Sequence, residues 1–248
     1  MSNIKSRERF SYRMYKYAWA GLDLFFPPHC GGCNSPGSRW CLQCQQMVNE
    51  LPPAVCIQCG RPYNIQSNCP ACEHSAPSYD SLRSWAYFDG PVRKAIHSLK
   101  YRGDITLGEI LARPLINIVD NLGWEPDLVL PVPMGVKRLS TRGYNHAALL
   151  ARPVAYAIGK PFFPRCLRKI RETSTQVGLS FSDRLMNVKG AFHAVVKYVS
   201  GSRVLIVDDV TTSGATMEAC ASALKEAGAD VVYGLTLART RFDAYQYA

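Results

Sequence analysis

Two adjacent carboxylates followed by small residues form the most informative chemical pattern in this 248-residue sequence. Asp208 and Asp209 come directly after the apolar run 204–207. Small side chains let backbone N–H groups approach an anion closely, and a helix that starts there adds its positive end. Two acids beside a phosphate suit a sugar with vicinal hydroxyls, and they can also hold hydrated Mg²⁺. The segment predicts a site for a ribose 5-phosphate compound, whose candidate contacts are Val210, Thr211, Thr212, Ser213, Gly214, Ala215 and Thr216. The alternative is a strand-to-helix turn with capping Thr and Ser.

Two further polar segments could act beside this site. In 130–138 a strand end precedes a loop with a glycine and two cations, and its candidate contacts are Met134, Gly135, Lys137 and Arg138. Residues 168–192 begin with a polar, glycine-containing part, which is typical of a lid that closes over a substrate. A plain strand-to-helix loop and a surface loop are the alternatives. The segment 130–138 becomes more informative beside the two acids.

Eight of the ten cysteines lie between residues 30 and 72, in four CxxC pairs. Two residues between thiolates allow a tight turn to present both sulfurs to one tetrahedral ion. The simplest arrangement is two structural Zn²⁺ sites, formed by Cys30, Cys33, Cys41 and Cys44 and by Cys56, Cys59, Cys69 and Cys72. Interleaved pairing and redox dithiols are the alternatives. Cys166 and Cys220 are isolated, and we expect them to be buried structural residues.

The elements that must position these residues follow from the apolar pattern. Apolar runs at 84–88, 127–133, 202–207 and 231–237 predict strands, and helical spacing predicts helices at 92–99, 105–122, 144–158 and 213–227. Pro114 and Pro153 are expected to kink or end two of these helices. Such alternation predicts an α/β domain over 79–248 with a mainly parallel sheet flanked by helices. Before it we expect an N-terminal helical arm at 1–29 and a small zinc-binding domain at 30–78, which is poor in aliphatic residues.

The charge of the chain favours acidic partners. The formal net charge is +10 at pH 7, and nine Lys or Arg but no Asp or Glu lie between Lys137 and Arg171. Tyr144, Tyr156, Phe162 and Phe163 are interspersed there, and basic grooves with stacking aromatics suit single-stranded nucleic acid. The alternative is that these cations serve a pyrophosphate or a solvated face. No apolar run is long enough to span a membrane, although the basic N-terminus could form an interfacial helix. Paired cysteines beside a nucleotide-type domain favour a cytoplasmic location, where cysteines more often bind metal than form disulfides.

The segment 204–216 resembles the signature of type I phosphoribosyltransferases, with Thr211 where many members carry an aliphatic residue. The resemblance implies that phosphoribosyl pyrophosphate binds with Mg²⁺, that Asp208 and Asp209 contact the ribose hydroxyls, and that 211–216 hold the 5-phosphate. It implies that 130–138 is a pyrophosphate loop and that 168–192 contains a flexible catalytic loop. Candidates on that loop for contacts to the pyrophosphate are Arg168, Arg171, Gln176 and Arg184. His97, His146 and His193 carry no pattern that singles them out.

The cysteine arm in front of such a domain resembles the ComF family of bacterial competence proteins. Matching stretches are 25–30, 98–103, 131–133, 142–147, 184–188 and 190–192, and Lys100 in the second of these is a candidate substrate contact. The resemblance covers nearly the whole chain. It implies a cytoplasmic protein, at the inner face of the membrane if a partner holds it there, that handles single-stranded DNA during natural transformation. A competence helicase or uptake-channel proteins are candidate partners.

Two classes of function fit these patterns. One is a catalytically active phosphoribosyltransferase of nucleotide metabolism, and the other is a DNA-handling protein whose phosphoribosyl site is regulatory or vestigial. A zinc-mediated adaptor is a third alternative. Some ComF relatives carry the label amidophosphoribosyltransferase, but residue 2 is Ser rather than a Cys nucleophile, and no glutaminase domain is expected in 248 residues. Because no element for recognising an acceptor is identifiable, ligand binding is the favoured interpretation and catalysis is left open.

Overall fold

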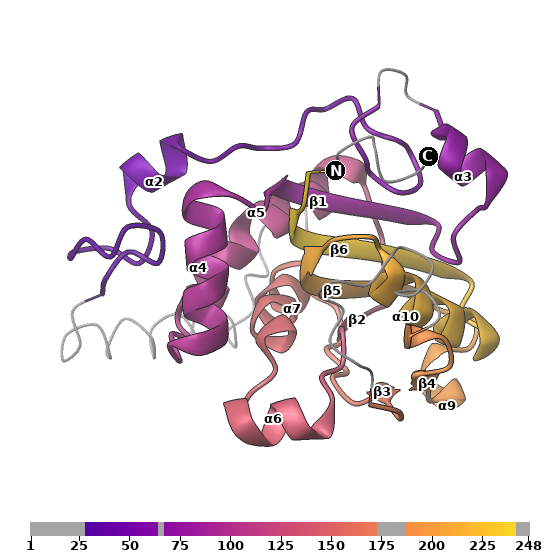
Figure 1. Ribbon diagram of the computed structural model, residues 1–248. Helices are drawn as coiled ribbons and strands as arrows, with labels where there is room; N and C mark the ends of the chain where they lie inside the picture. The colour runs from indigo at the N-terminus through magenta and orange to yellow at the C-terminus, as the bar shows by residue number, and fades with distance from the viewer. Residues whose placement is uncertain (1–27, 64–66, 173–186, 242–248) are drawn as a thin grey trace.

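A parallel four-stranded sheet forms the centre of the computed structural model, which describes residues 28–63, 67–172 and 187–241 (Figure 1). Its order is β1 (Ser81–Tyr87), β6 (Val231–Arg239), β5 (Arg203–Thr211) and β2 (Leu128–Pro131). Every pair of neighbours is parallel. The predicted α/β class with a mainly parallel sheet is therefore confirmed.

Helices cover both faces of this sheet, as the continuous apolar runs of its strands require. On one face α4 (Gly90–Tyr101), α5 (Leu107–Leu122) and α7 (His146–Ala157) pack against residues such as Leu205 and Val207. On the other face α10 (Ala215–Glu226) packs against Val204 and Ile206. Because side chains alternate between the faces of a strand, one apolar run supplies both cores.

The prolines do not end their helices. Pro114 lies inside the 16-residue α5, and Pro153 lies inside the 12-residue α7. Each proline removes one backbone donor, but both helices bury a long apolar face, which contributes more to helix stability than a single hydrogen bond. The alternative of an early stop is therefore wrong for both helices.

The strand that carries the two acids is longer than predicted. β5 continues through Asp208 and Asp209 to Thr211, because β6 extends beside it and pairs Val210 with Ala238. The acids are thus held within the ladder rather than in a loop after it. Only residues 212–214 remain between β5 and α10, so the turn is shorter than the predicted loop.

Smaller elements complete the domain, and the sequence patterns did not predict them. These are α6 (Val136–Arg142), α9 (Val196–Val199) and the antiparallel pair β3 (Leu167–Lys169) and β4 (Phe192–Ala194). The cysteine-rich region contains two short helices, α2 (Leu42–Gln46) and α3 (Pro70–His74). That region contacts the edge strand β1, where the Leu82 N–H donates to the Gln58 carbonyl at 2.7 Å.

The structure describes too little of residues 1–29 to test the predicted N-terminal arm, because 1–27 lie outside the described residues. Gln176 and Arg184 also lie outside them. Within the described ranges, no helix has both the length and the apolar character that crossing a membrane requires.

Candidate functional site

The turn after β5 forms one end of a cavity at the carboxyl edge of the sheet. Gly214 has a φ of +89°, a left-handed conformation that costs glycine little, and it places the start of α10 directly against the turn. The cavity has a volume of about 250 Å³. Its lining includes Thr211, Thr212, Gly214, Ala215 and Thr216, which are five of the predicted phosphate contacts. The Ser213 hydroxyl instead accepts a hydrogen bond from the Ala215 N–H at 3.3 Å, whereas the N-cap of α10 is Gly214.

A second cavity of about 540 Å³ adjoins the first, and Lys100, Asp208, Val210 and Thr216 line both. The second cavity brings the two acids together with the predicted residues Met134, Gly135 and Arg138. Residues that are distant in the sequence thus meet because the carboxyl ends of β2 and β5 are neighbours in the sheet. The order along the two cavities is a phosphate-type turn, an acid pair and a basic loop.

An unexpected carboxylate lies on the predicted pyrophosphate loop. Glu172 Oε1 is 3.4 Å from the Lys137 backbone nitrogen. A Cβ atom on Gly135 would stand only 2.5 Å from Glu172 Oε2, so a larger residue there would displace this carboxylate. The start of α6 therefore already accommodates an anionic group in this structure. The Lys137 side chain lines a neighbouring groove rather than this cavity.

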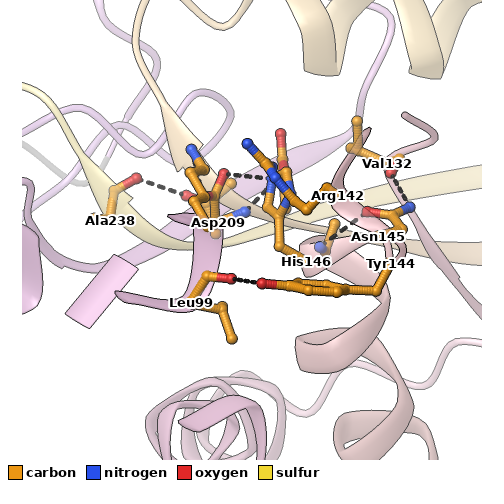
Figure 2. A network of polar contacts seen from close by, with 12 residues as sticks. Leu99, Val132, Arg142, Tyr144, Asn145, His146, Asp209 and Ala238 are labelled. Carbon is orange, nitrogen blue, oxygen red and sulfur yellow. Dashed lines mark hydrogen bonds and ion pairs between the residues drawn. The ribbon is translucent and has the colours of Figure 1, made fainter. Parts of the chain in front are cut away.

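A buried polar network holds Asp209 (Figure 2). Only 3% of Asp209 is exposed, and its Oδ2 forms an ion pair with Lys100 Nζ at 2.6 Å. His146 Nε2 lies 3.5 Å from Asp209 Oδ1, while Arg142 Nη1 lies 2.8 Å from His146 Nδ1. Because the guanidinium can only donate, Nδ1 must accept, which places the proton of the neutral ring on Nε2, towards Asp209. Both carboxylate oxygens of Asp209 are thus occupied by contacts with side chains of the protein.

The ends of α4 and α7 bring the partners of Asp209 into place. The Tyr144 hydroxyl donates to the Leu99 carbonyl at 2.6 Å, which fixes the last turn of α4 (Figure 2). Asn145 caps α7 through the Ala147 N–H and also donates to the Val132 carbonyl at 2.9 Å. These contacts lock both helix ends beside the acid pair.

The two acids have opposite electrostatic environments. Burial and the neighbouring charge of Asp209 raise the pKa of Asp208 to about 8. Burial also acts to raise the pKa of Asp209, but its interactions with His146 and the charge of Lys100 outweigh burial and hold that pKa below its ordinary value. Asp209 is therefore the fixed anion of the pair, and Asp208 is the carboxyl group that faces both cavities.

The structure adds site residues that the patterns missed. His146 contacts Asp209, Lys169 and Phe192 line the larger cavity, and Phe88 lines the smaller one. The stretch 142–147 contained the signal for His146, but a single histidine has no periodic pattern. Arg171 donates to the carbonyls of Asn187 and Lys189 at 3.0 and 2.7 Å. Arg171 precedes the segment 173–186 in the chain, and its two acceptors follow that segment.

Both predicted cysteine groups assemble in the sequential pairing. The sulfurs of Cys30, Cys33, Cys41 and Cys44 lie within 4.8 Å of one another, and so do those of Cys56, Cys59, Cys69 and Cys72. Cys33 and Cys41 are 3.6 Å apart between sulfurs, and Cys59 and Cys69 are 3.7 Å apart. A tetrahedral ion with Zn–S bonds of about 2.3 Å requires sulfur separations of about 3.8 Å, so the thiols fit zinc. Four thiolates leave no open coordination position, which indicates a structural metal.

Comparison with known proteins agrees with this architecture. Residues 106–243 match a family model described as a phosphoribosyl transferase domain, and residues 21–73 match a double zinc ribbon domain. The chain is 32% identical over 227 residues to the DNA utilization protein YhgH of Salmonella typhimurium, covering 88% of this chain and 99% of the relative. It is 29% identical to Competence protein F of Haemophilus influenzae, covering 85% and 95%. The chain belongs to the ComF family. The family membership that the sequence motifs indicated is thereby confirmed.

This ComF-family chain also overlaps solved structures of larger enzymes. It is 26% identical to glutamine phosphoribosylpyrophosphate amidotransferase from B. subtilis, covering 57% of this chain and 26% of that one, with a TM-score of 0.36. A score this low supports no conclusion about ligands. The fold of this ComF protein therefore rests on the family model, the parallel sheet and the two cysteine groups.

Proposed function

We propose that this ComF-family protein binds phosphoribosyl pyrophosphate with Mg²⁺ and also binds single-stranded DNA, and that it acts in DNA uptake. The observation that carries the first part is the continuous pair of cavities with Asp208 and Lys100 at their junction. The turn 212–214 and Thr216 suit the 5-phosphate, and Asp208 suits the ribose hydroxyls. The loop at Gly135, which accommodates the Glu172 carboxylate, suits the pyrophosphate.

Magnesium fits the same place on chemical grounds. Asp208, Asp209 and His146 offer ligand atoms within 4.8 Å of one another. Mg²⁺ favours oxygen ligands and is usually held by one or two carboxylates together with substrate phosphates. Since Lys100 and His146 already engage Asp209, Asp208 is the protein carboxylate that would meet a metal arriving with the pyrophosphate. The metal would neutralise charge on the pyrophosphate.

Removing loop hydroxyls tests the phosphate site. We expect Thr212→Val/Thr216→Val to weaken phosphoribosyl pyrophosphate and ribose 5-phosphate binding about 30-fold, since about 1 kcal/mol is lost for each hydrogen bond. Inorganic pyrophosphate should bind within about twofold of wild type, because its loop is intact. Isothermal titration with Mg²⁺ present measures all three ligands. Ser222→Ala, on the same helix but bonded to Glu226, is the control. Wild-type protein that binds none of the three ligands would contradict the proposal.

The DNA part of the proposal rests on a basic groove beside the larger cavity. The groove has a volume of about 450 Å³ and is lined by Lys100, Tyr101, Gly103, Lys137, Arg138, Thr141, Arg142 and Tyr144. Tyr101 is 70% exposed, and the Arg142 guanidinium carbon lies 5.1 Å from its ring centre. Four cations with an exposed aromatic ring and no acid among these lining residues suit a single strand, whose phosphates need cations and whose bases stack.

The aromatic residues in this groove differ from those that the sequence suggested. Of Tyr144, Tyr156, Phe162 and Phe163, only Tyr144 lines the groove, and its hydroxyl is bonded to Leu99. Phe163 contacts Tyr198 with ring centres 5.4 Å apart. The stacking candidate is therefore Tyr101, which lies outside the acid-free stretch. It reaches the groove because α4 ends beside α6 (Figure 1).

Substitutions in the groove test this placement. We expect Tyr101→Ala to weaken the binding of a labelled oligothymidine of about 20 nucleotides roughly tenfold, from lost stacking. Lys137→Gln should reduce the slope of log K against log salt concentration by about 0.7, the value for one phosphate contact. Fluorescence anisotropy over a salt series measures both. Tyr198→Ala and Lys94→Gln, at exposed positions elsewhere, are the matched controls. If affinity for the oligothymidine falls in the controls but not in the groove variants, the DNA binds elsewhere on the protein.

The proposed role in DNA uptake is supported by the names of the relatives, one of which is a competence protein and others of which are DNA utilization proteins. A competence helicase or an uptake channel is accordingly the class of partner to test, with the inner face of the membrane as the expected place. An active phosphoribosyltransferase is the alternative that the domain itself supports. Release of pyrophosphate from phosphoribosyl pyrophosphate in the presence of a nucleobase or DNA acceptor would favour it.

A further inference from the structure

The second cysteine cluster (Cys56, Cys59, Cys69 and Cys72) belongs to the same hydrophobic core as the start of α10. Its four cysteines are buried together with Ala215 and Met217, which lie in the first turn of that helix. The first cluster (Cys30, Cys33, Cys41 and Cys44) is different, since Cys33 is exposed and the neighbouring Gly31 and Gly32 approach Leu107 and Pro91 on α5 and α4. The two clusters therefore support different parts of the protein.

Tyr79 joins the second cluster to the turn 212–214. The ring is buried, and its hydroxyl lies 3.7 Å from the position that a Cβ atom on Gly214 would take. Tyr79 also belongs to the same buried apolar cluster as the four cysteines. One side chain thus packs between the cluster and the glycine that forms the turn.

Arg239 makes a second connection at the end of β6. Only 2% of this residue is exposed, and its guanidinium donates to the Cys59 carbonyl. Its backbone is paired with Thr211, the last residue of β5, and the next residue, Thr240, donates to the Thr211 carbonyl at 3.1 Å. Arg239 therefore spans from the cluster to the residue at which the turn begins.

A third connection reaches α10 itself. Ser78, which follows the cluster in the chain, donates from its backbone N–H and its hydroxyl to Glu218 at 2.8 and 2.6 Å. Glu218 lies in the first turn of α10. The turn is therefore held on three sides, by Tyr79 at Gly214, by Arg239 at Thr211 and by Ser78 at the helix.

Charge explains why an arginine is tolerated in this buried place. A zinc ion with four thiolates carries a net charge of about −2, and buried charges require compensation. Arg83 donates to the Ile57 carbonyl inside the cluster's loop at 2.9 Å. Arg83 and Arg239 thus place two cations against the loop that carries the sulfurs, where they can compensate the charge of a zinc tetrathiolate.

We propose that zinc at the second cluster holds the turn 212–214 in its anion-binding shape through Tyr79 and Arg239, and that zinc at the first cluster does not. The two metal sites are then unequal. Loss of zinc at the second cluster loosens the turn, while loss at the first leaves it intact. This inference rests on the proposed phosphate site, because the turn is the part of that site which the cluster supports.

Hydrogen exchange of the zinc-loaded protein tests the inference without any ligand. We expect Cys72→Ser to lose one zinc ion and to raise amide exchange in peptides covering 211–217 about tenfold. Arg239→Met, which keeps every cysteine, should raise it about threefold in the same peptides. Cys41→Ser should lose one zinc ion and leave this exchange within about twofold of wild type. Plasma mass spectrometry gives the zinc content of each variant.

Arg203→Met is the matched control for Arg239→Met, because Arg203 pairs with Asp127 and Glu125 at the opposite end of β5. If Cys72→Ser does not fold, Arg239→Met decides alone. Exchange in 211–217 that stays at the wild-type rate in Arg239→Met, or that rises equally in Cys41→Ser, would overturn the inference. Failure of wild-type protein to bind phosphoribosyl pyrophosphate is a separate result, which contradicts the proposed function but leaves the exchange comparison valid.

Discussion

Asp209→Asn is expected to lower the free energy of unfolding by about 3 kcal/mol, the range found when one partner of a buried ion pair is removed. Asp209 is almost fully buried and is the anion that Lys100 and His146 share. Asparagine keeps the shape of the side chain but not its charge, so the Lys100 ammonium would lose its partner at 2.6 Å. For a chain of this size the melting temperature should fall by about 6–12 °C.

Thermal unfolding at neutral pH, followed by circular dichroism, measures this effect. Asp208→Asn is the matched control, since it makes the same chemical change at the adjacent residue. A second control is Asp89→Asn, which removes an ion pair with the largely exposed Arg241 and should change stability by less than about 1 kcal/mol. A melting temperature for Asp209→Asn equal to that of wild type would show that the network does not stabilise the fold.

Asp208→Asn is expected to have the opposite balance, with binding lost and stability retained or increased. Asp208 lines both cavities, and in the proposed complex its carboxylate accepts hydrogen bonds from the ribose. Hydrogen bonds to charged groups contribute about 1.5–3 kcal/mol each, so affinity for phosphoribosyl pyrophosphate should fall about 100-fold or more. Titration calorimetry above pH 8, where Asp208 is ionised, measures the affinity. Binding within threefold of wild type would remove Asp208 from the proposed site.

The stability of this variant should depend on pH in a defined direction. The pKa of Asp208 is raised from 3.8 to about 8 in the folded protein, so the folded state binds more protons than the unfolded state between these values. Stability therefore falls as pH rises from about 4 to about 8 because of this group. Asparagine does not ionise, so the melting temperature of Asp208→Asn relative to wild type should rise over that range. A difference that is constant from pH 5 to pH 8 would contradict the assigned shift.

Together these variants separate two roles within one pair of acids. Asp209 is a positioning residue, which ties the ends of α4 and α7 to β5 through Lys100 and His146. Asp208 is left to meet the proposed ligand and its metal. These two roles of the acids are compatible with binding alone and with catalysis of phosphoribosyl transfer, because both roles serve ligand binding. Single substitutions are therefore more informative than the substitution of both acids at once.

The sequence alone determined the features that depend on local patterns. The apolar run before Asp208, the small residues after it and the four CxxC pairs each lie within a few residues, so their spacing is visible without a fold. The pattern of apolar residues also predicted the four strands of the parallel sheet and the four long helices. The sequential pairing of the cysteines followed from chain proximity, since short loops cost little entropy to close.

The tertiary structure decided which of these residues act together. The length of β5 depends on its pairing with β6, and that pairing moved the acids from a loop into a strand. The environments of Asp208 and Asp209 differ because α4 ends and α7 begins beside Asp209, and these segments are about 60 to 110 residues away from it in the chain. His146 and Arg239 are single residues whose partners are distant in sequence, so no local spacing could reveal them. Long-range packing, rather than residue type, therefore assigned their roles.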